Sequence, residues 1–365
     1  MSPRFVPGLK LSRLFFEAGV RPVLRRAFPR LRYSAGRLGD GSEVLGFDTP
    51  RSRDHNWGPR CQLFLSDCDF GRLRRAIDRA LRARLPIAVR GYPTNWKSLP
   101  EGEGMVRFPE AVPRGPVKHW CEIRTVRRYF RQPVAVDVTQ AMSPVDWLVL
   151  PHHELAQLTG GEVFHDGLGT LRPLRRRLRW YPDPVWRYCL AAQWARIDQE
   201  EPFPGRTQEV GDELGSRMLT ARLVRDVMWL GFLMERRWAP YSKWFGTAFS
   251  RLPCARRLGP PLLAALRARG WRERERQMSR AYEAAVRMHN ALKLTRPFPA
   301  KVSLFRTRPF RVIHAMALAE ALRKSIRDPR VRALPAYAGG VDTFADSTDV
   351  VDRPDLCRRL KAVYG

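Results

Sequence analysis

Residues 41–58 read GSEVLGFDTPRSRDHNWG, and this stretch decides how the rest of the chain is interpreted. It opens with a Gly-Ser turn, formed by Gly41 and Ser42, and it ends with DHNWG just before the apolar run CQLFL. Backbone N–H groups of such a turn can hold phosphate oxygens, while a carboxylate at the start of the next strand can hold the metal ion that bridges them. The stretch therefore predicts a phosphate and metal site, in which Asp54 begins a strand and Asn56 stands where a second carboxylate is expected.

On both sides of this stretch, the hydrophobic pattern predicts alternating strands and helices. Apolar side chains recur at helical spacing over residues 9–28, with a kink expected at Pro22. Residues 32–38 and 57–65 are typical of strands that flank the loop. We therefore expect residues 1–172 to form an α/β domain with a mixed sheet.

Residues 119–125, which read HWCEIRT, predict a later strand of the same domain. Glu122 lies between two apolar residues, so its carboxylate points to the opposite face of the sheet from theirs. Residues 160–171 predict a strand, an Asp-Gly turn and a further strand. If Asp54, Asn56 and Glu122 converge, their oxygens form a site that suits Mg²⁺ and a triphosphate.

Beyond residue 172 the pattern changes to successive helices separated by prolines. We expect a helical bundle over residues 173–340, followed by an acidic and basic C-terminal tail or cap over residues 341–365. The aspartates of the tail are interpreted as part of a solvated cap rather than as a metal site. Arg236 and Lys243 lie near aromatic residues at a helix break, where they are candidates to contact a nucleotide. The alternative for these two residues is a basic corner between helices.

The sequence resembles a family of uncharacterised bacterial proteins, domain of unknown function 4037 (DUF4037), which is grouped with the nucleotidyltransferase-fold superfamily. The resemblance is carried by GSEVLGF, SRDHNWGPR and LFLSD, and further along the chain by VFHDGLGTL, PYSKWFGTAF and RPFRVIHA. It is expected to cover nearly the whole chain, and SRDHNWGPR is its most specific phrase. The link to the wider superfamily rests on the Gly-Ser turn, the strand expected at Asp54, a later strand carboxylate and the Asp-Gly turn.

The resemblance implies a metal-dependent nucleotidyltransferase site. In the superfamily, two acids separated by one residue and a third acid from a later strand bind two metal ions, and the third acid helps to deprotonate the attacking hydroxyl. Carried over to this chain, Gly41 and Ser42 hold the triphosphate. Asp54 is then the first metal ligand, and Glu122 is the third acid. Asn56 replaces the second acid, and its amide oxygen brings no charge to the metals, so we expect transfer to be slowed by orders of magnitude or replaced by nucleotide binding alone.

The composition limits which binding partners and which cellular compartment are expected. The formal net charge is +30, and 58 of the 66 basic residues are arginines, which bind phosphate groups bidentately. The arginines are spread along the chain without an RNP, zinc-finger or basic-tail pattern, so anionic substrates are expected and specific nucleic-acid binding is not favoured. The six cysteines form no CxxC pair, and no apolar run approaches about 18 residues. The first residues lack the uninterrupted apolar region and the small-residue cleavage site that are typical of a secretory leader. We expect a reduced, cytoplasmic protein that does not cross a membrane.

Several familiar patterns are incomplete. HHELAQ lacks the second histidine of the HExxH zinc motif, so His152, His153 and Glu154 are interpreted as surface or buried polar residues of a helix. GDGSEVLG is not GxGxxG and GxxxxGK[ST] does not occur, so neither a Rossmann nor a P-loop site is expected. No serine lies in the context of a nucleophile elbow.

Three functions remain open from the sequence. The first is an enzyme that transfers a nucleoside monophosphate from a Mg²⁺-bound nucleoside triphosphate to a hydroxyl on a small molecule, a protein or an RNA, with Asp54 as the main metal ligand and Glu122 as the base. The second is a nucleotide-binding or regulatory module on the same fold, whose catalysis is lost through Asn56. The third and weaker one is an RNA-binding protein that uses its basic surface.

Overall fold

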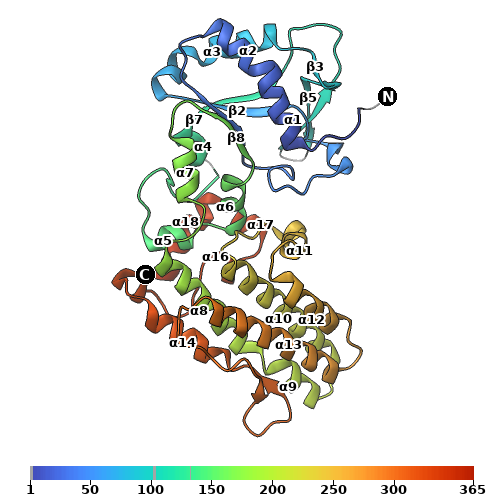
Figure 1. The fold of residues 1–365 in the computed structure, drawn as a ribbon, viewed down its shortest axis with the longest axis vertical. Helices are drawn as coiled ribbons and strands as arrows, with labels where there is room; N and C mark the ends of the chain where they lie inside the picture. Colours follow the sequence, from blue (N-terminus) through green and yellow to red (C-terminus); the bar gives the residue numbers. More distant parts are fainter. Residues whose placement is uncertain (1–2, 102–103, 132) are drawn as a thin grey trace. The chain divides into compact units, whose positions relative to one another are not determined.

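The computed structural model describes residues 3–101, 104–131 and 133–365, and the chain divides into two compact units. The first unit comprises Met1–Gln140 and Glu154–Arg179, and the second comprises Ala141–His153 and Trp180–Gly365. The first unit combines a mixed sheet with helices, whereas the second is almost entirely helical (Figure 1). An α/β part that is followed by a helical part is therefore confirmed as the class of fold.

The first unit is built on a four-stranded sheet whose strands, in spatial order, are β7 (Trp120–Thr125), β2 (Arg60–Leu65), β1 (Ser34–Arg37) and β8 (Glu162–Asp166). Strand β1 is antiparallel to both of its neighbours, whereas β2 and β7 are parallel. Every residue of β1 and β2 is buried. Polar side chains on these two strands therefore need partners inside the unit.

Helices pack on one face of this sheet and form the core of the first unit (Figure 1). The helix predicted over residues 9–28 consists of α1 (Gly8–Phe15), a π-helical turn (Phe16–Val20) and α2 (Arg21–Ala27). The turn lies just before Pro22, which has no N–H to continue the helical ladder. Helix α3 (Asp67–Arg84) follows β2. The buried apolar residues that these helices and β2 share include Phe15, Phe16, Leu24, Leu63, Leu65, Ile77 and Leu81.

The strand after the Gly-Ser turn begins later than the sequence predicts. Asp54 is expected at the start of a strand, but β2 begins at Arg60, and Asp54 ends a short 3₁₀ helix, η2 (Pro50–Asp54). Asn56 has a φ of +49° and Gly58 has a φ of +151°, so the chain turns twice before it becomes extended. The prediction that Asp54 lies on a strand is wrong.

Residues 144–158 have the sequence pattern of one helix, with Ser143 as its N-cap and Pro144 at its first position, but they form two helices. They are α5 (Pro144–Leu148) and α6 (His152–Thr159), and Pro151 lies between them. Because proline has no N–H and disfavours helical geometry in the preceding residue, the first helix ends before it and the second begins after it. His152 and His153 therefore occupy the first turn of a helix rather than its middle.

Side-chain caps and long-range pairing account for the remaining differences in the first unit. A strand is expected after the Asp-Gly turn, but helix α7 (Leu171–Arg177) forms there, and the Asp166 carboxylate accepts the Arg172 N–H at 2.9 Å. The prolines and glycines of residues 93–118 predict a loop, yet this segment contains a long hairpin. The hairpins of this region are β3 (Ala88–Val89) with β4 (Tyr92–Pro93), and β5 (Asn95–Glu101) with β6 (Gly104–Glu110).

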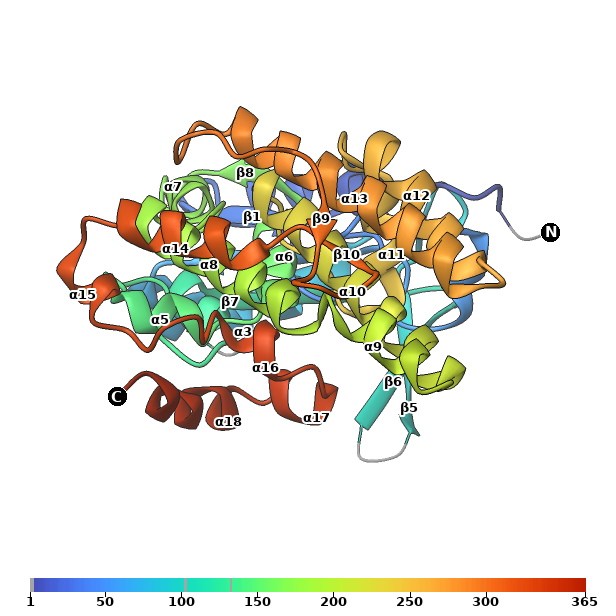
Figure 2. The same ribbon diagram turned by 90° about the horizontal axis from the view of Figure 1, so that it is seen from below.

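The second unit is a set of packed helices, as predicted. Helix α8 (Asp183–Glu200) packs against α10 (Glu213–Met234) and α14 (Ala315–Ser325), as Figure 2 also shows for α8 and α14. Among the described residues, no helix has the length and apolar character needed to span a membrane. The other elements are α9 (Phe203–Glu209), α11 (Ser242–Ser250), α12 (Ala255–Arg267), α13 (Trp271–Ala291), α15 (Pro329–Arg332), α16 (Val341–Phe344), α17 (Thr348–Val351), α18 (Pro354–Arg359), η3 (Leu360–Tyr364), and the hairpin of β9 (Ser303–Leu304) and β10 (Arg311–Val312).

Candidate functional site

The Gly-Ser turn is held by three buried charges. Glu43 accepts hydrogen bonds from Arg37 Nε at 2.9 Å and from Arg60 Nη2 at 2.7 Å. Arg37 ends β1, Arg60 begins β2, and the side chains of the arginines and Glu43 are 1%, 4% and 3% exposed. Gly41 has a φ of +123°, and a Cβ at this position would lie 2.5 Å from Glu43 Oε2 and 2.6 Å from Arg60 Nη2. The close approach of these side chains therefore requires glycine in the turn.

The two arginines keep the Glu43 carboxyl ionised although it is buried. Burial raises the pKa of the Glu43 carboxyl, but the charges of Arg37 and Arg60 outweigh burial and lower the pKa to about 2. Arg37 also donates hydrogen bonds to the carbonyl groups of Leu38 and Asp40. The arginines nearest to the turn are therefore already paired, and phosphate binding by Gly41 and Ser42 stays a prediction.

Asp54 and Asn56 have different surroundings. Asp54 is 59% exposed, and its Oδ1 accepts the His55 N–H at 3.0 Å. Asn56 is tied to β6, because its Oδ1 accepts the Arg107 N–H at 2.9 Å and its own N–H donates to the Arg107 carbonyl at 2.8 Å. Asparagine also tolerates the left-handed backbone conformation at this position better than most residues. The Asn56 amide thus fastens the loop to a hairpin, a role that requires no metal.

Glu122 lies in the middle of β7, as predicted. The parallel register pairs it with Gln62 of β2, so its neighbour on that strand is an amide and not Asp54 or Asn56. The Gln62 side chain hydrogen-bonds with the main chain just beyond β1, at 3.0 and 3.2 Å. The Trp120 Nε1–H donates to Glu122 Oε1 at 3.2 Å. The strand pairing therefore brings no second carboxylate next to Glu122, and metal binding by Asp54, Asn56 and Glu122 stays a prediction.

Glu122 does line a groove that the sequence analysis does not identify. The groove has a volume of about 530 Å³ and lies along α3 and the outer edge of β7. Six arginines line it: Arg74, Arg75, Arg79, Arg82, Arg124 and Arg128. The sequence signal was the run RLRRAIDRALRAR in α3, but only the structure shows that this run faces the strand that carries Glu122. We call this feature the arginine groove.

Most of the charge in the arginine groove is not neutralised. Of its six arginines, only Arg82 forms an ion pair within the described part of the chain, to Asp78 at 2.7 Å. His119 Nε2 lies 3.4 Å from the same Asp78. The guanidinium groups of Arg74 and Arg128 lie 5.5 and 4.9 Å from the Phe70 ring, an arrangement that leaves their N–H groups available. The groove is therefore suited to a ligand with several negative charges.

In the second unit, the two predicted nucleotide contacts are exposed and stack on aromatic rings. Arg236 follows the end of α10, and its guanidinium lies 3.9 Å from the centre of the Trp186 ring. Lys243 is in the first turn of α11, with its ammonium 5.2 Å from the centre of the Trp244 ring. These contacts agree with the basic corner between helices, and nucleotide binding by Arg236 and Lys243 stays a prediction.

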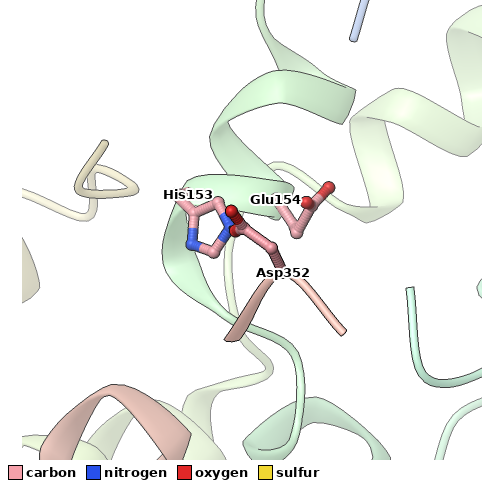
Figure 3. A group of neighbouring side chains, drawn as sticks. All are labelled: His153, Glu154 and Asp352. Atoms are coloured by element: carbon pink, nitrogen blue, oxygen red, sulfur yellow. The ribbon is translucent and has the colours of Figure 1, made fainter. Parts of the chain in front are cut away.

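The C-terminal segment contacts the first turn of α6. The Asp342 carboxylate accepts the His152 N–H at 3.0 Å, and Asp352 Oδ1 lies 2.7 Å from His153 Nε2. Figure 3 shows His153 and Asp352 together with Glu154, which follows His153 in the helix. The aspartates of this segment were expected in a solvated cap; Asp352 is 56% exposed, but it is engaged with a buried histidine.

Comparison with known proteins gives one family match. The model of a domain of unknown function, DUF4037, matches residues 147–245. The match contains VFHDGLGTL and the start of PYSKWFGTAF, so the predicted family resemblance is confirmed over this segment. Residues 41–58 lie outside it, and the wider extent of the resemblance stays a prediction. No curated protein and no solved structure matches the chain.

The buried triplet makes a prediction about stability and pH. Replacing Glu43 by Gln leaves two buried guanidinium groups without a counter-charge, so E43Q is expected to lower the free energy of unfolding at pH 7 by about 3–5 kcal/mol. The folded pKa of Glu43 is about 2 and its ordinary value is 4.5, so the ionised carboxylate stabilises the fold fully above pH 4.5 and loses this effect as the pH falls through 2.

Denaturant unfolding between pH 7 and pH 2 measures this effect. The difference in unfolding free energy between the wild type and E43Q should narrow by about 3 kcal/mol over this range. Asp40→Asn is the control, because Asp40 is 78% exposed and lies 4.0 Å from Arg60. If the difference in unfolding free energy between the wild type and E43Q stays constant with pH, the lowered pKa of Glu43 is contradicted.

Proposed function

We propose that the first unit binds a nucleoside triphosphate in the arginine groove, as a member of the nucleotidyltransferase-like class. The observation that carries the proposal is that Glu122, the strand carboxylate expected from the resemblance, lines the same groove as six arginines. Guanidinium groups form bidentate hydrogen bonds with phosphate oxygens. The volume of about 530 Å³ lies within the usual range for small-molecule sites.

Binding without transfer is the function that the geometry supports best. Two-metal transfer needs carboxylates that share the metal ions, whereas the β2 residue beside Glu122 is Gln62. Asn56 uses its amide oxygen to hold Arg107. We therefore infer a nucleotide-binding or regulatory module, and transfer of a nucleoside monophosphate from the Mg²⁺-bound triphosphate to a hydroxyl acceptor is the alternative.

Removing arginines from the groove is expected to weaken triphosphate binding. Each charge-assisted hydrogen bond contributes about 1.5–3 kcal/mol, so Arg79→Ala and Arg124→Ala should each raise the Kd for ATP or GTP about tenfold or more. Equilibrium binding of labelled nucleotides, with and without Mg²⁺, measures this. Arg72→Ala is the matched control, because Arg72 lies on the same helix and does not line the groove. Absence of triphosphate binding, or equal affinity in all variants, contradicts the proposal.

Replacing Glu122 distinguishes direct binding of the phosphates from binding through a metal ion, because the two predict opposite changes in triphosphate affinity. If phosphates bind the arginines directly, Glu122→Gln removes a repulsive charge and should tighten binding about fivefold, which corresponds to about 1 kcal/mol at ~4 Å in water. If a metal ion joins Glu122 to the phosphates, the same change should weaken Mg²⁺-dependent binding and stop pyrophosphate release.

Asp54 and Asn56 test the transfer alternative directly. Transfer on the pattern of the resemblance requires that Asp54→Ala abolishes pyrophosphate release and that Asn56→Asp increases it. We expect neither variant to change triphosphate affinity by more than about twofold, because neither residue lines the arginine groove. Pyrophosphate release by the wild type that disappears in D54A would show that the enzyme, and not the binding module, is the correct description.

A further inference from the structure

A second group of chemically active side chains lies at the first turn of α6, on residues that the proposed nucleotide site does not use. His153 is 7% exposed, and its Nε2 lies 2.7 Å from Asp352 Oδ1. Glu154 follows in the same helix, and the nearest ligand-type atoms of the three side chains all lie within 4.8 Å of one another. Figure 3 shows the Asp352 carboxylate against the imidazole of His153, whereas the neighbouring Glu154 carboxylate points away from the imidazole in this view.

This set of donors has the composition of a metal site. Imidazole nitrogen and carboxylate oxygen are the donors that Zn²⁺ takes at about 2.0–2.2 Å. Ligand atoms at this distance in a tetrahedral site lie ~3.4 Å from one another. The His153 and Asp352 atoms, which are 2.7 Å apart, would therefore separate slightly, and the more distant donor atoms, which lie within 4.8 Å, would approach by up to ~1.4 Å through side-chain rotation. The incomplete HExxH pattern does not reveal the site, because its third donor comes from the C-terminal segment.

The second unit provides room for an ion and its water ligands. A hollow of about 270 Å³ is lined by His153 and Asp352 together with Asp342, Asp346 and Tyr241. Arg225 also lines this hollow, and it is paired with Asp346 at 3.2 Å. The lining thus offers more carboxylates than cationic side chains, in a chain whose net charge is +30.

The backbone holds the histidine in position. The Asp342 carboxylate accepts the His152 N–H at 3.0 Å, which fixes the start of α6 and therefore the direction of the next side chain. Asp342 and Asp352 both belong to the C-terminal segment, so this segment supplies one anchor for the helix and one donor for the site.

We propose that His153, Glu154 and Asp352 bind one divalent transition-metal ion of the Zn²⁺ class. The ion would fasten the C-terminal segment to the first turn of α6 and keep at least one coordination position open to the hollow. This site is independent of nucleotide binding, because none of its residues lines the arginine groove. A simple His153–Asp352 ion pair is the competing explanation, and it requires no affinity for metal ions.

The test uses the full chain after removal of metal ions with a chelator. Calorimetric titration with Zn²⁺ should show one ion per chain, and Co²⁺ should give the visible absorption of a low-symmetry site with nitrogen and oxygen ligands. His153→Gln and Asp352→Asn should each weaken Zn²⁺ binding tenfold or more. His119→Gln is the matched control, because His119 forms the similar pair with Asp78 and should leave the titration unchanged.

The outcomes separate the metal site from the ion pair. Because Asp352 is 56% exposed, D352N is expected to fold, and its circular dichroism should match that of the wild type. Zn²⁺ binding that is absent in the wild type, or equal in the wild type, H153Q and D352N, overturns the proposal. Loss of triphosphate binding in the arginine variants has no bearing on this result, so the two proposals fail separately.

Discussion

The sheet of the first unit depends on the buried pairing of Glu43 with Arg37 and Arg60. These residues join the end of β1, the start of β2 and the loop between them, so the three segments are fixed by a single carboxylate. Burying three charges is costly, and the arrangement is stable only because each guanidinium has a partner. The interaction extends further, since Arg60 and Arg107 each lie 4.5 Å from the centre of the Trp120 ring. β7 and the β5–β6 hairpin are thereby tied to the same centre.

Local signals in the sequence predicted helices and strands well where nearby residues determine the backbone conformation. The 18-residue helix α3 follows from its periodicity and from Ser66, whose Oγ accepts the Asp69 N–H at 3.1 Å. Strand β7 follows from alternation around Glu122. The position of Asp54 could not be predicted in this way, because the loop is shaped by the bond between Asn56 and Arg107, which are 51 residues apart.

The candidate sites were harder to predict, because they depend on which elements become neighbours. The sequence places Glu122 on a strand, but only the register shows that Gln62 lies beside it. The arginines of α3 were visible in the sequence, and their position along the edge of β7 was not. The same holds for His153 and Asp352, which meet although 199 residues separate them. Spacing along the chain shows which side chains share a face only within one helix or strand. Each of these sites combines residues from several elements.

The two arginine sets of the first unit differ in a way that bears on function. Arg37 and Arg60 are buried, and the chain supplies Glu43 to neutralise them. In the arginine groove, five guanidinium groups lie within one hollow without a carboxylate partner among the described residues. Like charges that gather in this way repel one another and lower the stability of the fold. An anionic ligand would remove that repulsion, and this is the physical reason for proposing that the groove binds phosphate groups.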